Sequence, residues 1–155
     1  MIYKTTIILI LFMLFPFVIF ANNGDAVKNI RSFNDLRWEK RILLIYENES
    51  ENMNNFLSTL EKAEEQLSNR DVLWFLLKEG KITSNSHLSW DDKFFQKIEK
   101  VYFSDKKNKV LLIGKDGSTK SISKKLALDN LISLIDSMPM RRLEILEEAT
   151  KIPSP

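Results

Sequence analysis

Three short stretches of the chain are almost continuously apolar and predict buried strands. They span residues 41–46, 72–77 and 110–113 and consist mainly of Leu, Ile, Val and aromatic residues. A strand with one solvent-facing side alternates apolar and polar residues, whereas a continuous apolar run is typical of a strand covered on both faces. The pattern therefore predicts an α/β protein with helices on both sides of a sheet. Trp38 and Trp74 are expected to be buried or half-buried.

The stretches between and after these strands repeat apolar residues at helical spacing. Residues 50–69, 94–102 and 128–138 each place their apolar side chains on one face of a helix. Because the first helix joins two strands of one sheet, the unit over residues 41–77 is expected to pair its strands in parallel through a right-handed crossover.

Polar residues separate the second strand from the second helix. Residues 81–88 are predicted to form a polar loop, and Ser89 with an acid three positions later resembles the capping box that begins a helix. Asp91 and Asp92 would then complement the helix dipole from the first turn.

The last third of the chain predicts a hairpin, a helix and a tail. An Asp-Gly pair at 116–117 favours a tight turn, and residues 118–123 have so few apolar side chains that a solvent-facing edge strand is expected. Pro139 is expected to stop or kink the last helix. In the tail, Leu143 and Leu146 are the expected contacts with the rest of the domain.

The predicted elements follow the order β-α-β-α-β-β-α, with parallel early strands and a final hairpin plus helix, which is the thioredoxin arrangement. We therefore expect a single α/β domain that forms a thioredoxin-like three-layer sandwich. The chain divides into a signal peptide at residues 1–21 and a domain at 22–155, with a core over about 36–142 and a helical tail at 143–155. This length is sufficient for one domain with its own hydrophobic core.

The first residues have the pattern of a secretory signal peptide. Lys4 precedes an apolar run over residues 7–20, and Ala21 then meets a polar segment. The run is shorter than the roughly 20 residues that a membrane-spanning helix needs, and Ala21 suits cleavage by a signal peptidase. We expect a periplasmic or secreted protein that begins at Asn22 and does not bind the membrane after cleavage. An uncleaved membrane anchor is the alternative.

The composition excludes several kinds of chemistry. The chain has no cysteine, which excludes thiol redox chemistry and thiolate nucleophiles. Removing Lys4 from the 23 Lys and Arg leaves 22 against 21 Asp and Glu, and this balance provides no field that attracts nucleic acid. His87 is the single histidine and has no second His or Cys with which to form a zinc site. We expect no cofactor, no metal and no nucleic-acid partner.

Four segments of the chain resemble a known family. Residues 37–45, 69–72, 111–117 and 135–142 are similar to the exported domain called DUDES, which occurs in bacteria and in secreted sushi-repeat proteins of animals. The resemblance spans nearly the whole mature chain, and its last segment is the specific part. It implies a thioredoxin-like fold without an established activity. The animal relatives suggest roles in extracellular adhesion or matrix.

One group of residues is a candidate binding surface. Two arginines follow Pro139, and in the predicted topology they approach the turn after the third strand or the lead into the first strand. The candidate partner-binding residues are Arg141, Arg142, Lys115, Asp116, Trp38 and Arg41. Guanidinium groups can engage carboxylate or phosphate through two parallel hydrogen bonds. The alternative is structural, because an arginine paired with Asp116 would pin the tail to the hairpin.

No catalytic group emerges from the sequence. Ser50 lies between two carboxylates, but it lacks the glycines of a nucleophile elbow and suits a helix cap better. The sequence thus predicts a noncatalytic thioredoxin-like module that binds an envelope or extracellular protein. The alternative is an envelope enzyme with a non-thiol mechanism, hydrolytic or peroxide-related, which rests on fold analogy alone.

Overall fold

The residues that the computed structural model describes are 28–47, 50–105, 107 and 109–151, with the backbone only at 50–53 and 151. The predicted signal peptide and the last four residues of the predicted tail lie outside the described residues. Among the helices of the described part, none is both long and apolar enough to cross a membrane.

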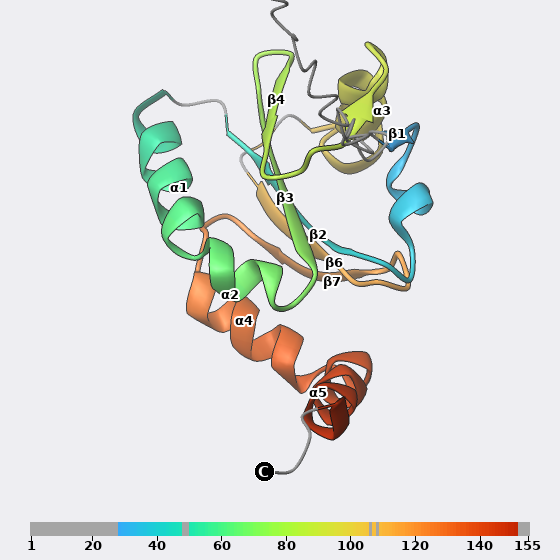
Figure 1. Ribbon diagram of the computed structural model, residues 1–155. Coiled ribbons are helices and arrows are strands. Elements are labelled where there is room, and N and C mark those ends of the chain that lie inside the picture. The colour runs from blue at the N-terminus through green and yellow to red at the C-terminus, as the bar shows by residue number, and fades with distance from the viewer. Residues whose placement is uncertain (1–27, 48–49, 106, 108, 152–155) are drawn as a thin grey trace, which may run out of the picture.

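A five-stranded mixed sheet forms the middle of the protein (Figure 1). Its strands are β2 (Arg41–Tyr46), β3 (Val72–Lys78), β4 (Lys81–Ser84), β6 (Lys109–Ile113) and β7 (Thr119–Ser123), in the order β4-β3-β2-β6-β7. β2 and β3 run parallel, and the other neighbouring pairs are antiparallel. The three predicted buried strands are confirmed and lie side by side, and β7 is the polar edge strand that the sequence predicts.

Helices cover both faces of this sheet. One face carries α1 (Ser50–Lys62), α2 (Glu64–Ser68) and α4 (Leu128–Ser137) (Figure 1). The other face carries α3 (Phe94–Tyr102), the 3-10 helix η1 (Phe33–Leu36) and a small parallel sheet of β1 (Asn29–Ile30) and β5 (Ser89–Trp90). The last helix, α5 (Pro139–Lys151), extends from the end of α4. The expected α/β class is confirmed.

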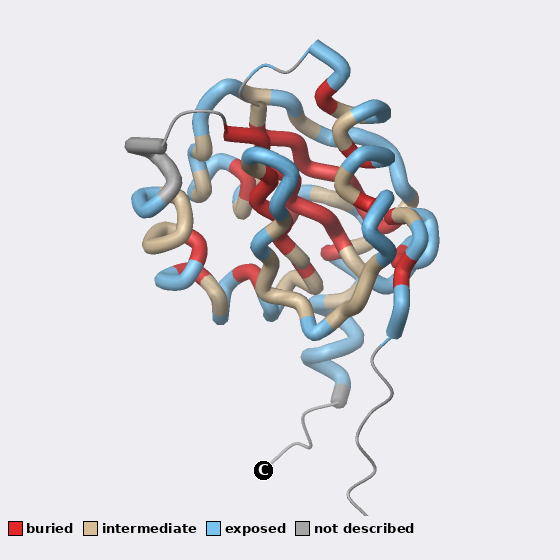
Figure 2. Tube along the Cα trace, turned by 90° about the horizontal axis from the view of Figure 1, so that it is seen from above, coloured by how far each residue is buried: buried red, intermediate tan, exposed pale blue. Residues whose placement is uncertain are grey.

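The two faces of the sheet contribute to two separate hydrophobic clusters. In β2, Leu43 and Ile45 belong to the cluster under α1, α2 and α4, whereas Ile42, Leu44 and Tyr46 belong to the cluster under α3 and η1. All five are buried, because successive side chains of a strand point to opposite faces and both faces are covered. Figure 2 shows the central strands as the buried interior, surrounded by more exposed segments. This double coverage explains the continuous apolar runs.

The polar loop predicted at residues 81–88 is wrong in part. Lys81–Ser84 forms β4 along the edge of β3, and the next residues lead into β5, which pairs with β1. In the turn before β4, Glu79 and Gly80 have φ angles of 46° and 78°. Two left-handed residues in succession suit the twist of a two-residue hairpin. The expected order β-α-β-α-β-β-α therefore omits β4 and the small sheet of β1 and β5.

The predicted start of the second helix also differs from the structure. Ser89 belongs to β5 and not to a capping box, and α3 begins at Phe94. Asp91 Oδ1 accepts a hydrogen bond from the backbone N of Lys93 at 3.0 Å, so this carboxylate orders the turn before the helix. Asp91 and Asp92 precede the first turn of α3 rather than occupying it.

A sharp corner joins α4 to α5. Met138 has an extended backbone, with φ −68° and ψ 140°, and Pro139 is the first residue of α5. Proline disfavours helical geometry in the residue before it and fits the first position of a helix, where its missing N–H is not needed. The prediction that Pro139 stops or kinks the preceding helix is confirmed, and the helical tail begins at this residue rather than at 143.

The hairpin before β4 provides a test of the fold. Gly80→Ala should lower the free energy of unfolding by about 1 kcal/mol, because alanine is strained at positive φ. The backbone alone would cause this loss, since a Cβ at Gly80 meets no other atom within 4 Å. Urea denaturation measures the change. The control Gly80→Asn should retain more stability, because asparagine tolerates left-handed geometry. An alanine variant as stable as the parent would contradict this hairpin geometry.

Candidate functional site

Three charged residues at or next to the ends of different strands meet at one end of the sheet. Arg41 begins β2, and the antiparallel pairing of Ile42 with Ile113 brings it near Lys115, which follows β6. On the β3 side, the backbone N of Arg41 donates a hydrogen bond to the carbonyl oxygen of Asp71 at 2.8 Å. The register of the sheet therefore gathers these three charges, and the corner between α4 and α5 lies beside them (Figure 1).

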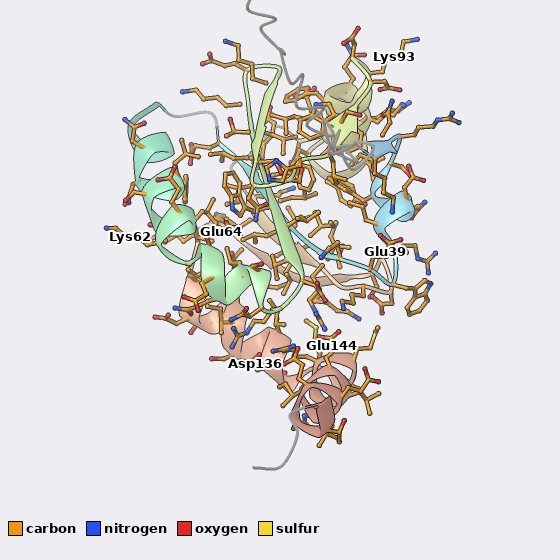
Figure 3. All side chains as sticks on the ribbon, viewed as in Figure 1. Glu39, Lys62, Glu64, Lys93, Asp136 and Glu144 are labelled. Atoms are coloured by element: carbon orange, nitrogen blue, oxygen red, sulfur yellow. The ribbon has the colours of Figure 1, made fainter. Side chains whose placement is uncertain are left out.

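Glu144 of α5 accepts hydrogen bonds from the two cations of this group. Its carboxylate oxygens lie 3.1 Å and 3.0 Å from Nη1 and Nη2 of Arg41. One of them also lies 2.7 Å from Nζ of Lys115. Arg41 is only 1% exposed and Lys115 is 8% exposed. Figure 3 shows Glu144 where α5 meets the rest of the domain. Paired buried charges thus join α5 to the sheet.

Asp71 shares the Lys115 ammonium with Glu144. Lys115 Nζ lies 2.8 Å from Asp71 Oδ2, and Lys40 Nζ lies 2.8 Å from Oδ1 of the same carboxylate. The loop before β3, which contains Asp71, is therefore tied both to the end of β6 and to the residue that precedes β2.

A second set of ion pairs joins α4 to the loop before β3, and Arg141 of α5 lies 3.8 Å from the same carboxylate, that of Asp136. Arg70 forms two hydrogen bonds with Asp136 of α4, at 2.8 Å and 2.7 Å, and these bonds are the main cause of a lowered pKa for Asp136. Arg141 Nη1 lies 3.1 Å from Glu148 and 3.4 Å from Glu144. We call the whole set the corner ion network, and its members are Lys40, Arg41, Arg70, Asp71, Lys115, Asp136, Arg141, Glu144 and Glu148.

The carboxylates beside the sheet are held in the ionised form. Burial alone would raise the pKa of Glu144, but hydrogen bonds from Arg41 and Lys115 outweigh burial and leave this pKa below its ordinary value. The pKa of Asp71 is lowered in the same way, because burial opposes ionisation and the hydrogen bonds from Lys115 and Lys40 favour it more strongly. Both carboxylates are therefore ionised near neutral pH.

A cavity of about 290 Å³ adjoins the corner ion network, between the turn that joins β6 to β7 and the corner of α4 and α5. We call it the corner cavity, and its lining consists of Arg41, Gly114, Lys115, Asp116, Lys120, Leu134, Met138, Pro139 and Met140. Asp116 Oδ2 lies 2.7 Å from Lys120 Nζ, and this bond, together with the backbone N–H of Ser118, lowers the pKa of Asp116 to about 2. One wall is thus charged and the other is apolar.

Four of the six predicted site residues lie together at this corner. Arg41, Lys115 and Asp116 line the corner cavity, and Arg141 belongs to the corner ion network with 7% exposure. Arg142 is exposed on α5, and its side chain forms no hydrogen bond or ion pair with the other described residues. The two neighbouring arginines therefore differ, since one is part of the internal network and the other faces solvent.

Trp38 is exposed, although it was expected to be buried or half-buried. Its side chain is 61% exposed, and the guanidinium carbon of Arg37 lies 5.6 Å from the centre of its ring. Its backbone has a φ of 68°, and its N–H donates to the carbonyl oxygen of Lys115 at 2.7 Å. This left-handed residue turns the chain just before β2 enters the sheet and leaves the indole outside. The same expectation is confirmed for Trp74, which is buried in β3.

The predicted contacts of the tail are wrong. Leu143 and Leu146 are 60% and 62% exposed, so α5 is not docked through its leucines. Residues three and four positions apart share one face of a helix, and the face that meets the domain carries Arg141, which lies near Asp136 of α4, and Glu144, which binds Arg41 and Lys115. Charge, rather than apolar contact, orients this helix.

The residues that sequence reasoning missed are the carboxylates Glu144, Asp71 and Asp136. Ion pairs between distant positions leave no local pattern in a sequence. One signal was available, because Arg41 opens a strand that is otherwise apolar, and an arginine at such a position is buried only with a carboxylate partner.

Among the residues that the structure describes, the corner brings together neither a thiol nor a set of metal ligands. The chain has no cysteine, and within the described ranges no group of three or more His, Asp or Glu side chains is placed to hold a metal ion. His87 is exposed before β5 and distant in sequence from the network. The network carboxylates are each bound by a cation, which suits them to fixing geometry rather than to proton transfer.

Comparison with known families matches residues 32–144 to a family described as Domain of unknown function (DUF4174). Comparisons with curated proteins and with solved structures gave no match. The match covers β2 to α4 and ends at Glu144, so it includes both the corner ion network up to that residue and the corner cavity. It does not confirm the resemblance to DUDES.

Removing the charge of Glu144 should destabilise the protein strongly. Glu144→Gln leaves the buried cations Arg41 and Lys115 without their shared carboxylate, and breaking a buried ion pair from one side costs about 3 kcal/mol. Glu147→Gln, on the same helix but exposed, is the matched control and should change stability by no more than about 0.5 kcal/mol. Urea denaturation measures both. Equal stability of the two variants would refute the role of Glu144 as the shared partner of the two buried cations.

Acid should weaken the corner ion network. A carboxylate whose pKa is lower in the folded state stabilises the fold above its unfolded pKa, and this contribution is lost as the pH falls through the folded value. The pKa values of Glu144 and Asp71 lie below their reference values of 4.5 and 3.8. The free energy of unfolding should therefore decline as the pH falls below about 5. Denaturation at stepped pH should show a shallower decline for Glu144→Gln. If the stability of the parent and that of the Glu144→Gln variant declined equally with falling pH, the lowered pKa of Glu144 would not be the cause of the decline.

Proposed function

We propose that this chain, which belongs to the DUF4174 family, is an exported noncatalytic module that binds a protein partner at the corner of α4 and α5. The partner would be an envelope or extracellular protein. The observation that carries the proposal is the corner cavity, where buried cations face an apolar wall beside an exposed tryptophan. Concave sites of this kind, mostly apolar with a few fixed polar groups, are typical of binding sites.

The fold that we infer for this module is thioredoxin-like. The strands β3, β2, β6 and β7 support this inference, because a parallel pair is followed by an antiparallel hairpin and then by α4 on the same sheet. β4 and the small sheet of β1 and β5 would be additions to that arrangement. A fold of this class hosts many activities and assigns none by itself.

A noncatalytic role is favoured by the chemistry of the chain. In a redox thioredoxin the cysteine pair follows the first strand of the redox core, and here residues 47–51 at that position contain only Glu, Asn and Ser. Without sulfur there is no disulfide exchange. The carboxylates that could act as a base at the corner are already bound by cations. Nothing among the described residues favours the enzymatic alternative.

Exposed residues around the corner cavity supply the contact surface. The backbone of Trp38 is bonded to Lys115 of the cavity wall, and the Arg37 side chain lies over its indole and beside Gly117 of the β6–β7 turn. Tryptophan and arginine are the residue types most enriched among those that dominate the energy of protein interfaces. Arg142 adds an exposed cation on α5. Residue types that protein partners use are therefore exposed on segments that adjoin the cavity wall.

Export is part of the proposal. It rests on Lys4, the apolar run at residues 7–20 and Ala21, which together match a signal peptide. The absence of cysteine is compatible with an oxidising compartment, where the domain would depend on its core and ion pairs rather than on disulfides.

The proposed surface can be tested by capture. Trp38→Ala combined with Arg37→Ala should reduce the capture of cross-linked envelope proteins at least about tenfold, because truncated interface anchors dominate binding energy. Both side chains are exposed, so the melting temperature should stay within a few degrees of the parent value. Val101→Ala combined with Lys93→Ala, exposed on and before α3, is the matched control. Unchanged capture by the folded double variant would remove this surface from the proposal.

A further inference from the structure

We propose that the corner cavity binds a carboxylate that carries a small apolar group, and that the free edge of the Arg41 guanidinium receives the two carboxylate oxygens. This inference rests on the proposed binding function and names its ligand chemistry. Two kinds of molecule carry this chemistry, namely a free short-chain carboxylic acid and the C-terminal residue of a peptide.

The hydrogen bonds of Arg41 leave part of its guanidinium group unpaired. A guanidinium has five N–H donors. Nη1 donates to the Arg70 carbonyl oxygen at 2.7 Å and to Glu144 at 3.1 Å, and Nη2 donates to Glu144 at 3.0 Å. Nε has no hydrogen-bond partner. The remaining donors are therefore Nε–H and the second N–H of Nη2, which lie side by side along one edge of the planar group.

That open edge is the geometry that a carboxylate fits. Two parallel N–H donors on one edge of a guanidinium match the two oxygens of a carboxylate. Arg41 Nε is buried as well as unpaired, and a buried donor without an acceptor is costly. A carboxylate reaches this edge from the cavity when the side chains that cover it move aside. Arg41 also lines the corner cavity. Arg141 Nε differs, because it retains Asp136 at 3.8 Å and its residue is not part of the cavity lining.

Lys115 supplies a second donor to the same cavity. Its ammonium group has three N–H donors, and the acceptors around it are Asp71 and Glu144. One donor is left for a ligand in the cavity that Lys115 lines. An anion between Arg41 and Lys115 would therefore accept hydrogen bonds from the remaining donors of two cations that Glu144 already orients.

The local charge favours a single negative charge. The charged side chains of the corner ion network and the cavity wall comprise six cations, Lys40, Arg41, Arg70, Lys115, Lys120 and Arg141, and five carboxylates, Asp71, Asp116, Asp136, Glu144 and Glu148. The excess of one cation is balanced by a carboxylate monoanion. A phosphate dianion would leave the site with excess negative charge, which is unfavourable at a buried position.

The opposite wall selects an apolar group of limited size. Leu134, Met138, Pro139 and Met140 form this wall, and the two methionines can adapt to the shape of a ligand. The volume of about 290 Å³ is at the lower end of the range for small-molecule sites. The ligand is therefore a small amphipathic carboxylate rather than a long lipid.

Calorimetric titration of the purified protein tests this assignment. Octanoate represents the free acid and N-acetyl-leucine represents a peptide C-terminus. At least one of them should bind at least about tenfold more tightly than octanol, acetate and inorganic phosphate, because each of those lacks the monoanionic carboxylate or the apolar group. Equal binding of octanol, tighter binding of phosphate, or no binding by either carboxylate would overturn the proposal. The tighter of the two carboxylates identifies the source.

Variants at Met140 test whether the carboxylate binds in the corner cavity. Met140→Glu adds a carboxylate to the wall in the first turn of α5, a position where acidic residues are tolerated, and should weaken binding of the preferred carboxylate at least about tenfold. Met140→Leu keeps an apolar wall and should bind within about threefold of the parent. Leu143→Glu is the charge-matched control, because it lies on the exposed side of the same helix. Equal binding by the Met140→Glu and Leu143→Glu variants would exclude the cavity.

The role of Arg41 has its own variant. Arg41→Lys keeps the charge but removes the open edge, and it should weaken binding at least about tenfold in protein that melting shows to be folded. If the Arg41→Lys variant does not fold, the comparison of Met140→Glu with Met140→Leu tests the ligand site instead. Loss of carboxylate binding with partner capture intact refutes only the ligand chemistry. Carboxylate binding with capture unaffected by the Trp38 and Arg37 substitutions refutes the protein-binding surface instead.

Discussion

The architecture of this corner depends on the ion pairs that the carboxylate of Glu144 forms. It pairs with Arg41 at the start of β2 and with Lys115 after β6, two cations that the sheet register brings together and the surrounding chain buries. Buried charges are tolerated only when they are paired and hydrogen-bonded. The leucines of α5 face solvent, so the position of this helix is set mainly by the ion pairs of Glu144 with Arg41 and Lys115 and by the approach of Arg141 to Asp136 of α4. The same group of ion pairs therefore fixes the strand ends, the helix and the cavity between them.

Ion pairs of this kind are not an efficient way to stabilise a protein. The cost of removing two charges from water is similar to the gain from pairing them, and apolar replacements are often equally stable. What the network provides is fixed geometry. Arg41 is held end-on by Glu144 and by the Arg70 carbonyl oxygen, which leaves the opposite edge of its guanidinium in a defined direction. A rigidly oriented donor pair binds with little further loss of conformational freedom.

Much of the fold could be predicted from the sequence, because its central elements are specified by local pattern. Residues 41–46, 72–77 and 110–113 are apolar on both faces, and only a sheet covered on both sides accepts them. β4 was missed because a short polar edge strand depends on its pairing with β3 and not on its own composition. The start of α3 was misplaced because Ser89 has the spacing of a cap yet pairs as a strand with β1.

The candidate site was predictable in part for the same reason. Arg41, Lys115 and Arg141 stand out as cations at the ends of predicted elements, and the expected topology brings those ends together. Glu144 could not be found in this way, because its partner Arg41 is distant in the chain and acidic residues are frequent in the tail. The amphipathic pattern of α5 favoured its leucines, but a helix that is held by buried charges can leave its apolar side chains in solvent.

Backbone strain is concentrated at the same corner. Three residues other than glycine have left-handed φ angles among the described residues, and one of them, Glu79, is explained by the β3–β4 hairpin. The other two are Trp38 and Asp71, with φ of 68° and 53°, and each is bonded through its backbone to Lys115 or Arg41. Strained residues persist where the surrounding structure fixes them, and they gather at functional sites. Buried cations, a guanidinium edge without a partner and two strained residues therefore meet where β2, β6 and α5 join, and this coincidence is what the proposed binding site rests on.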